Sequence, residues 1–261
     1  MPIVTLTSDF GLRDYYVSAM KGVILRTAPS VRIVDLCHAI PPQSMESGAF
    51  VLQHAAREFP PSTVHCAVVD PGVGTARRAL AFASRDHVWV GPDNGLLHFA
   101  LQDADGSVYA IDPDRLKTGR LSATFHGRDL FAPVASHLAN GRNLSDIGEP
   151  ISDPQLLSSA PFQYRVDGVD GRVIHVDHFG NLVTNIPRSA IASLGEPLHV
   201  YVGTIPHAIE LKRTYAEVSP NQLLALVGSA DLVEISVNKG DARRRLNAEY
   251  GTSVRIEKQS M

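Results

Sequence analysis

Cysteine and long hydrophobic runs are scarce in this sequence of 261 residues. Its 2 cysteines, Cys37 and Cys66, are too few for a disulfide framework, and each lies in an apolar stretch typical of a buried free thiol. No stretch approaches the roughly 18 to 20 uninterrupted apolar residues of a transmembrane helix. The opening residues, MPIVTLTSDFG, lack the basic start and apolar core of a signal peptide. We therefore expect a soluble, cytoplasmic protein without membrane association.

An excess of charge of one sign is also missing. The sequence has 24 Lys and Arg against 27 Asp and Glu, a formal net charge of -3, and no basic run longer than the three arginines at 243–245. Nucleic-acid-binding domains usually carry a basic patch, so no nucleic-acid partner is expected. The 11 histidines show no HExxH or paired-cysteine spacing, so we expect no metal site.

The first third of the sequence alternates segments typical of strands and helices. Strand patterns at 3–7, 31–34 and 64–69 are separated by helical patterns at 13–26 and 44–59. This order favours a parallel sheet with helices on both faces. A hairpin at 80–90, a strand at 108–111 and a helix at 125–138 are expected to follow.

The pattern changes near residue 163. Residues 143–163 are rich in loop signals, with three prolines and little periodicity, and strand patterns follow one another beyond them. We predict an α/β protein with an N-terminal, mostly parallel α/β sandwich domain at 1–163. A smaller C-terminal antiparallel β domain is predicted at 164–261.

Aspartates follow three of the predicted strands, as Asp9, Asp35 and Asp70. Ligands of open α/β sheets bind at the carboxyl ends of strands, so Asp9 and Asp70 are candidate ligand residues. Aspartate also begins turns and caps helices, which is our preferred interpretation of Asp35. The glycine-rich segment after Asp70 lacks the Lys-Ser/Thr ending of a phosphate-binding loop.

Five motifs occur along the chain in a fixed order. They are TSDFG at 7–11, DPGVGTARR at 70–78, GPDNGLL at 91–97, FHGRDLFAP at 125–133 and DHFGNLVTN at 177–185. Together they resemble the S-adenosylmethionine hydroxide adenosyltransferases, relatives of the fluorinase and chlorinase. The resemblance implies a hydrolase in which water-derived hydroxide attacks C5′ of the ribose, giving adenosine and methionine. S-adenosylmethionine is then the substrate, and no cofactor is implied.

The resemblance implies three catalytic residues around the attacking water: Asp70, Arg77 and His126. A neutral thioether leaves from a sulfonium, so the chemical difficulty lies in presenting an oriented, desolvated oxygen rather than in protonating the leaving group. Asp70 or His126 can accept the proton, and Arg77 can stabilise hydroxide character. The structural alternative is an Asp-Arg pair that fixes the glycine-rich turn, with a histidine at a helix entry.

The resemblance also implies substrate-binding residues in both halves of the chain. They are Asp9 for the ribose hydroxyls, Asp14 and Asp177 for the methionine ammonium, Ser229 for its carboxylate, and Phe179 and Asn181 for the adenine. The alternative for the segment 179–181 is a β-turn with a core phenylalanine. A homotrimer with sites between subunits is implied as well.

The fluorinase differs from this chain at several of these positions. It carries Tyr and Ser where this chain has His126 and Gly127, and Tyr at the position of Asp70. A carboxylate at Asp70 repels a halide, so hydroxide is the predicted nucleophile and a halogenase the less favoured alternative. The fluorinase also has Arg at Ala230 and Trp at Val183 and Gln43, so the carboxylate and adenine contacts are expected to differ in detail.

Two further alternatives belong to other functional classes. One is a non-catalytic S-adenosylmethionine or adenosine binder, which would not need Asp70, Arg77 and His126 together. The other is a structural α/β domain with a β interaction module, which would leave the five ordered motifs unexplained.

Overall fold

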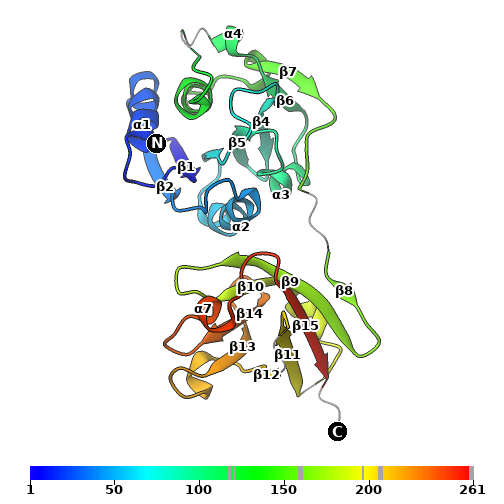
Figure 1. The fold of residues 1–261 in the computed structure, drawn as a ribbon. Helices are drawn as coiled ribbons and strands as arrows, with labels where there is room; N and C mark the ends of the chain where they lie inside the picture. Colours follow the sequence, from blue (N-terminus) through cyan, green and yellow to red (C-terminus); the bar gives the residue numbers. More distant parts are fainter. Residues whose placement is uncertain (117–118, 120, 158–160, 196, 205–207, 259–261) are drawn as a thin grey trace. The chain divides into compact units, whose positions relative to one another are not determined.

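The computed structural model describes all residues except 117–118, 120, 158–160, 196, 205–207 and 259–261 (Figure 1). Contacts within the chain divide it into two compact units, Met1–Ser158 and Ser159–Met261. The protein is a mixed α/β structure, and each unit is built on a sheet of its own. None of the helices in the described part of the chain has the length and apolar character needed to cross a membrane.

The sheet of the first unit has the strand order β2-β1-β3-β5-β4-β6-β7. Its strands are β1 (Ile3–Ser8), β2 (Arg32–Cys37), β3 (Val64–Val68), β4 (Ala79–Ser84), β5 (His87–Pro92), β6 (Val108–Ile111) and β7 (Gly148–Ile151). The half from β2 to β5 is parallel, and the half from β5 to β7 is antiparallel. The sheet is therefore mixed, whereas the sequence predicted a mostly parallel one.

The reversal of strand direction begins at the predicted hairpin of β4 and β5. Only Arg85 and Asp86 separate the two strands, and both have positive φ, at 49° and 65°. A two-residue turn of this type joins antiparallel strands directly, whereas a parallel pair needs a long crossover. The strands β6 and β7 then continue the antiparallel half.

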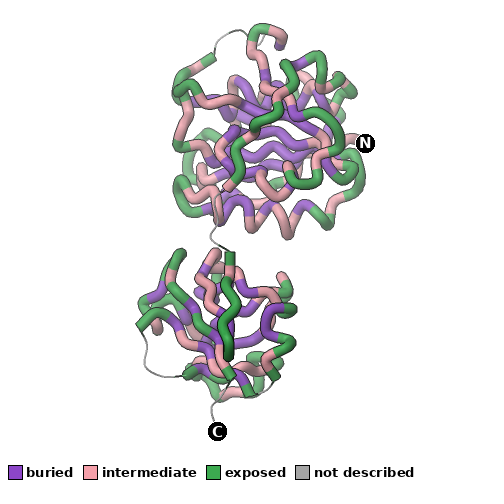
Figure 2. Tube along the Cα trace, turned by 90° about the vertical axis from the view of Figure 1, so that its right-hand side faces the viewer, coloured by how far each residue is buried: buried purple, intermediate pink, exposed green. Residues whose placement is uncertain are grey.

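Helices cover both faces of this sheet, as the alternating pattern predicted. They are α1 (Tyr16–Thr27), α2 (Met45–Ala55), α3 (His98–Leu101), α4 (Pro113–Leu116) and α5 (Ala132–Ala139). One hydrophobic cluster packs Leu6 and Cys66 with helical residues such as Met20, and a second packs Ala67 on the opposite face with Leu52. Neighbouring residues of β3 thus point to opposite faces, as the pleat requires, and the central strands β1, β3, β4 and β5 are largely buried (Figure 2).

The second unit consists mainly of antiparallel strands. They are β8 (Gln163–Tyr164), β9 (Gly168–Val176), β10 (Leu182–Pro187), β11 (Leu198–Val202), β12 (Ile209–Glu210), β13 (Leu223–Val227), β14 (Leu232–Val237) and β15 (Ser253–Lys258). The sheet runs β12-β11-β15-β9-β10-β14-β13, and a bridge between Leu211 and Ala225 brings its two ends together. The sheet is therefore nearly a closed barrel, with two short helices, α6 (Arg188–Ile191) and α7 (Ala242–Leu246).

Candidate active site

The carboxyl end of β3 carries the first polar group of the candidate site. Every residue of β3 is buried, and Asp70 follows the strand by two positions. The turn after Asp70 is held by its own hydrogen bonds, including one from Thr75 Oγ1 to the carbonyl of Gly72 at 2.7 Å. Gly74 lies in this turn at a φ of 77°, and a Cβ there would overlap the carbonyl oxygen of Ala123. The compact turn brings the residues that follow it back towards Asp70.

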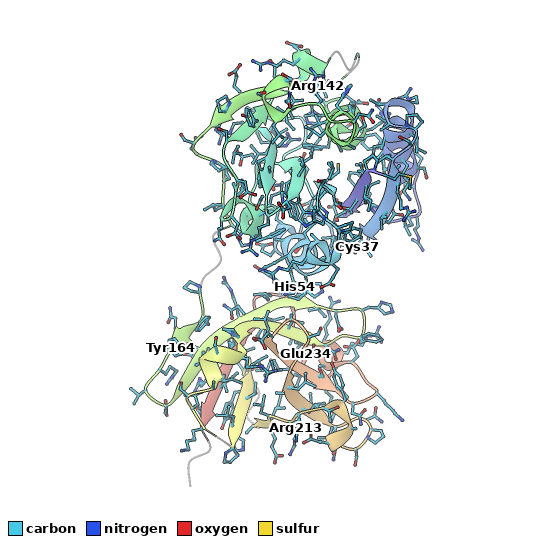
Figure 3. The ribbon with its side chains drawn as sticks, turned by 180° about the vertical axis from the view of Figure 1, so that it is seen from behind. Cys37, His54, Arg142, Tyr164, Arg213 and Glu234 are labelled. Atoms are coloured by element: carbon cyan, nitrogen blue, oxygen red, sulfur yellow. The ribbon has the colours of Figure 1, made fainter. Side chains whose placement is uncertain are left out.

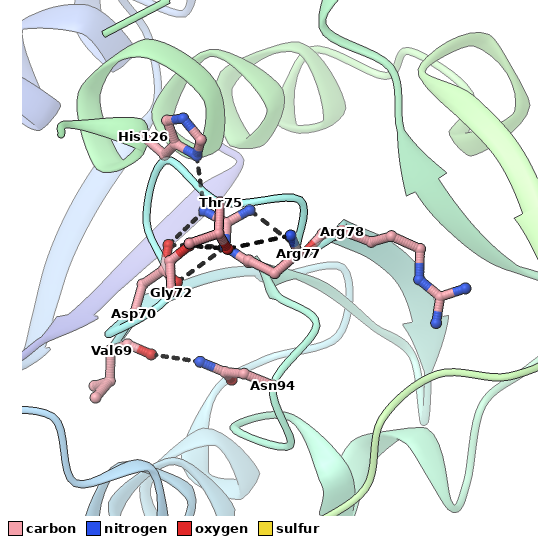
Figure 4. Close-up of polar contacts among 8 residues, drawn as sticks. All are labelled: Val69, Asp70, Gly72, Thr75, Arg77, Arg78, Asn94 and His126. Atoms are coloured by element: carbon pink, nitrogen blue, oxygen red, sulfur yellow. Dashed lines mark hydrogen bonds and ion pairs between the residues drawn. The ribbon is translucent and has the colours of Figure 1, made fainter. Parts of the chain in front are cut away.

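Arg77 is in direct contact with both Asp70 and His126 (Figure 4). Arg77 Nε donates to Asp70 Oδ1 at 2.9 Å and to Oδ2 at 3.0 Å, and Nη2 donates to Oδ2 as well. Arg77 Nη2 also lies 2.7 Å from Nδ1 of His126. The side chains of Asp70 and Arg77 are only 4% and 10% exposed. The structure therefore brings together three residues that lie up to 56 positions apart.

The protonation of His126 follows from its partner. A guanidinium can only donate hydrogen bonds, so Nδ1 of His126 accepts one, and the neutral ring carries its proton on Nε2. Burial lowers the pKa of His126, and the charge of Arg77 lowers it further, against the opposing effect of Asp70 and Asp129. At neutral pH the ring is uncharged and is a donor through Nε2.

A cavity of about 390 Å³ opens beside these residues. Asp70 and His126 line it, together with the rings of Phe10, Tyr15, Tyr16 and Phe125. The ring centroids of neighbouring members of this aromatic group lie 4.8 to 6.2 Å apart. Aromatic faces attract cations, and the guanidinium of Arg128 already lies 4.9 Å from the ring centre of Phe125. The cavity thus combines a carboxylate, a neutral imidazole and a wall suited to a positively charged ligand.

The helix predicted at 125–138 begins with a π-helical turn, Gly127–Phe131, directly after His126. Such turns are frequent at functional sites. A Cβ on Gly127 would lie 3.2 Å from both the Phe10 ring and the sulfur of Met20, closer than ordinary packing allows. The ring of Phe10 therefore occupies the space that a larger side chain beside His126 would need.

Asp9 lies at the end of β1, the parallel neighbour of β3. Ser8 is paired with Val68 in the register, so Asp9 and Asp70 follow adjacent strand ends. Oδ2 of Asp9 accepts a hydrogen bond from the backbone N–H of Gln43 at 2.8 Å. Asp14 is exposed in the loop before α1.

The other four predicted binding residues belong to the second unit. Asp177 Oδ1 accepts from the N–H groups of Phe179 and Asn181 at 2.9 Å, and Oδ2 accepts from the amide of Asn181 at 2.9 Å. The carboxylate therefore organises the turn at 177–181. Phe179 is 71% exposed, so it is not the core residue that the structural alternative assumed. Ser229 is also exposed.

A buried carboxylate in the second unit was not predicted from the sequence. Glu234 is 8% exposed and accepts hydrogen bonds from Tyr215 Oη at 2.6 Å and Ser236 Oγ at 2.8 Å. Burial raises the pKa of Tyr215, and the carboxylates of Glu234 and Asp177 add to the effect. The only signal in the sequence was a glutamate within the apolar segment LVEISV, which does not reveal its distant partner.

The preferred interpretation of Asp35 was wrong. Asp35 lies inside β2 rather than at a turn or a cap, and it contacts Lys21 and His38.

Among the residues that the structure describes, no group of three or more His, Cys, Asp or Glu side chains could hold a metal ion.

Comparison with known proteins adds a further line of evidence. The family model described as SAM hydroxide adenosyltransferase N-terminal domain matches residues 4–148, and the C-terminal domain model matches residues 171–255. A curated relative from Salinispora arenicola, named (R)-S-adenosyl-L-methionine hydrolase, is 42% identical and aligns over 98% of this chain and 97% of its own length. A relative of the same name from Thermus thermophilus is 39% identical over 97% of this chain and 98% of its own.

A solved structure resembles the fold over nearly its full length. The crystal structure of an uncharacterized conserved protein from Thermotoga maritima superimposes with a TM-score of 0.90 at 35% identity, covering 98% of this chain and 100% of that one.

Proposed function

The chain belongs to the SAM hydroxide adenosyltransferase family, and we propose that it hydrolyses S-adenosyl-L-methionine to adenosine and L-methionine. The observation that carries this proposal is the contact among Asp70, Arg77 and His126 at the edge of the cavity. The curated relatives named as hydrolases align over nearly the whole chain, so both units take part in the resemblance.

The reaction is a displacement at C5′ of the ribose. The oxygen of water forms a bond to C5′ while the bond from C5′ to sulfur breaks, and its electron pair stays on sulfur as the neutral thioether of methionine. One proton of the water must leave. No acid is needed for the leaving group, so the protein has to orient the water and receive its proton.

The hydrogen bonds divide these tasks between Asp70 and His126. Nδ1 of His126 is occupied by the guanidinium, and Nε2 carries a proton, so the ring can donate to the water oxygen but is a poor acceptor. Asp70 Oδ1 accepts a single bond from Arg77, which leaves it a lone pair for the water. Asp70 is thus the proton acceptor, His126 orients the water, and Arg77 offsets the negative charge that develops on oxygen.

Two features of the cavity favour hydroxide over halide. The carboxylate of Asp70 opposes the entry of an anion but accepts a hydrogen bond from water. At Gly127 there is no side-chain hydroxyl, and Phe10 and Met20 would have to shift by a few tenths of an ångström to admit a side chain there.

The contacts of the substrate are part of the proposal. We assign the ribose hydroxyls to Asp9, whose carboxylate lies at the strand end next to that of Asp70. The methionine ammonium is assigned to Asp14 and Asp177. The remaining assignments are Ser229 for the methionine carboxylate and Phe179 and Asn181 for the adenine. A cytoplasmic homotrimer with sites between subunits completes the proposal.

Product analysis tests this function. Purified protein is incubated with S-adenosylmethionine in chloride-containing and chloride-free buffer, and the products are separated by chromatography. Equal amounts of adenosine and methionine in both buffers are expected. A 5′-halogenated nucleoside as main product would contradict the choice of nucleophile, and binding without turnover would indicate a non-catalytic binder.

A further inference from the structure

The loops that follow β1 and β2 are tied together by one residue, His38. Its ring Nδ1 lies 2.7 Å from Ser8 Oγ, and both residues are buried. Its main-chain carbonyl accepts a hydrogen bond from the N–H of Gly11 at 2.8 Å. His38 therefore holds both ends of the four-residue turn 8–11, and Asp9 lies between the two attachment points.

The same loop also fixes the carboxylate of Asp9. The N–H of Gln43 donates to Oδ2 at 2.8 Å, and Gln43 holds this position with a left-handed backbone at a φ of 64°. Among the described residues no donor reaches Oδ1 of Asp9. Oδ2 is thus anchored through one of its lone pairs, while its second lone pair and Oδ1 are available to the two hydroxyls of a ligand.

Two charged groups, Asp35 and Lys21, lie behind His38. Nε2 of His38 lies 3.1 Å from Asp35 Oδ1 without the alignment of a hydrogen bond, and Asp35 Oδ2 accepts from Lys21 Nζ at 2.6 Å. Burial tends to raise the pKa of Asp35, but its contacts with Lys21 and His38 outweigh burial and lower it. Asp35 is therefore ionised.

The ionised Asp35 faces Nε2 of His38 and favours a proton on that nitrogen. In that tautomer Nδ1 accepts a hydrogen bond from the hydroxyl of Ser8. The oxygen of Ser8 in turn accepts from the N–H of Phe10 at 3.3 Å, and Phe10 lines the cavity. These linked contacts, from Asp35 through His38 and Ser8 to Phe10, hold the turn that carries Asp9 in one orientation.

We propose that His38 is a positioning residue for Asp9, and that its bond to Ser8 gives the site its selectivity for a ribose with both hydroxyls present. The inference rests on the proposed function, in which Asp9 accepts hydrogen bonds from the 2′- and 3′-hydroxyls. A carboxylate accepts from two neighbouring hydroxyls only when its plane is correctly turned, so a loosened turn loses the preference for the diol.

Calorimetry with adenosine and 2′,3′-dideoxyadenosine tests this role. The wild type is expected to bind adenosine at least about tenfold more tightly, since hydrogen bonds to a charged group are strong. His38→Leu should bring the two affinities to within about twofold, whereas His38→Asn, whose side-chain oxygen can still accept from Ser8, should keep part of the preference. A matched control is His54→Ala in α2 (Figure 3). The ring of His54 bonds to the carbonyl of Phe50 in its own helix.

The outcomes separate positioning from a purely structural role. In an Asp9→Ala background, His38→Leu should cause no further change in the affinity ratio, and Ser8→Ala, which removes a single hydroxyl, should lower the ratio even if His38→Leu fails to fold. A folded His38→Leu or Ser8→Ala variant with the wild-type ratio would overturn the inference while leaving the proposed function intact. A wild type that binds both nucleosides equally, or neither, would remove the ribose assignment of Asp9 and the inference with it.

Discussion

Arg77 Nη2 lies 2.7 Å from Nδ1 of His126, and this contact fixes the ring as an acceptor on that side. Because the guanidinium also holds both oxygens of Asp70, a single cation sets the orientation of the carboxylate and the tautomer of the imidazole. The proposed roles of Asp70 as proton acceptor and His126 as donor rest on this arrangement.

Asp70→Asn should lower kcat by roughly 10²- to 10⁴-fold, the usual contribution of a general base, with a small effect on KM. The amide is similar in size but accepts a proton poorly. Steady-state kinetics with S-adenosylmethionine measures the change. Asp153→Asn is a suitable control, because Asp153 pairs with Arg78 and is exposed. If Asp70→Asn turned over as fast as the wild type, Asp70 would have a structural role only.

The pH dependence of kcat/KM should show an acid limb caused by His126. Burial and Arg77 lower the pKa of His126 below its ordinary 6.5, so the ring is neutral at pH 7 and becomes protonated only in more acidic solution. The new proton on Nδ1 would face the guanidinium and break the contact. A pH profile should therefore be flat above neutrality and fall below the ordinary pKa of histidine. If His126→Asn, at its lower rate, kept the same limb, another group would be responsible.

The stability of the protein should fall in acid because of His65. Burial, with the nearby His87, lowers the pKa of His65 to about 3, and its Nδ1 is 2.7 Å from Thr5 Oγ1. Between pH 6.5 and about 3 the unfolded chain binds the proton and the folded chain does not, so stability declines as the pH falls, by at most about 1.4 kcal/mol per pH unit.

Urea unfolding between pH 7 and 4 measures this decline. His65→Gln should reduce the pH dependence, whereas a substitution of the exposed His178 should leave it unchanged. Equal pH dependence in the His65 variant and the wild type would mean that other buried groups are responsible.

Gly127→Ala should destabilise the first unit by about 1 to 3 kcal/mol, because the added methyl group presses on Phe10 and Met20. The matched control is Gly22→Ala in the middle of α1, where no atom lies within 4 Å of an added Cβ. Alanine is the better helix former, so this change should raise the free energy of unfolding by about 0.5 to 1 kcal/mol. Urea unfolding measures the free energy of unfolding of both variants. Equal stability of both variants would show that Phe10 moves aside without cost.

Phe179→Ala should weaken the binding of adenosine without changing the melting temperature, because the ring is 71% exposed and contributes little to the core. The loss is expected to be about three- to tenfold, as for one aromatic contact. Tyr164→Ala removes another exposed ring, in β8, as a control. A lower melting temperature with unchanged affinity would indicate a structural role for Phe179.

Local patterns in the sequence were enough to predict the strands β1 to β3, the hairpin of β4 and β5, and the helices α1, α2 and α5. The convergence of Asp70, Arg77 and His126 was available only through the resemblance of the motifs. The continuation of the antiparallel half beyond that hairpin was not predicted, because the pairing of β6 with β7 joins segments about 40 residues apart. His38 and Ser8 also lie far apart in sequence, as do Tyr215 and Glu234. The periodicity of the sequence therefore indicates neither contact.

Isotope labelling shows whether the 5′ oxygen of the product comes from water. The protein is incubated with S-adenosylmethionine in water enriched in oxygen-18, and the adenosine is analysed by mass spectrometry. We expect each adenosine to carry one oxygen-18 atom at its 5′ position and to be matched by one methionine. Adenosine without the label, or no adenosine at all, would contradict the attack of water at C5′.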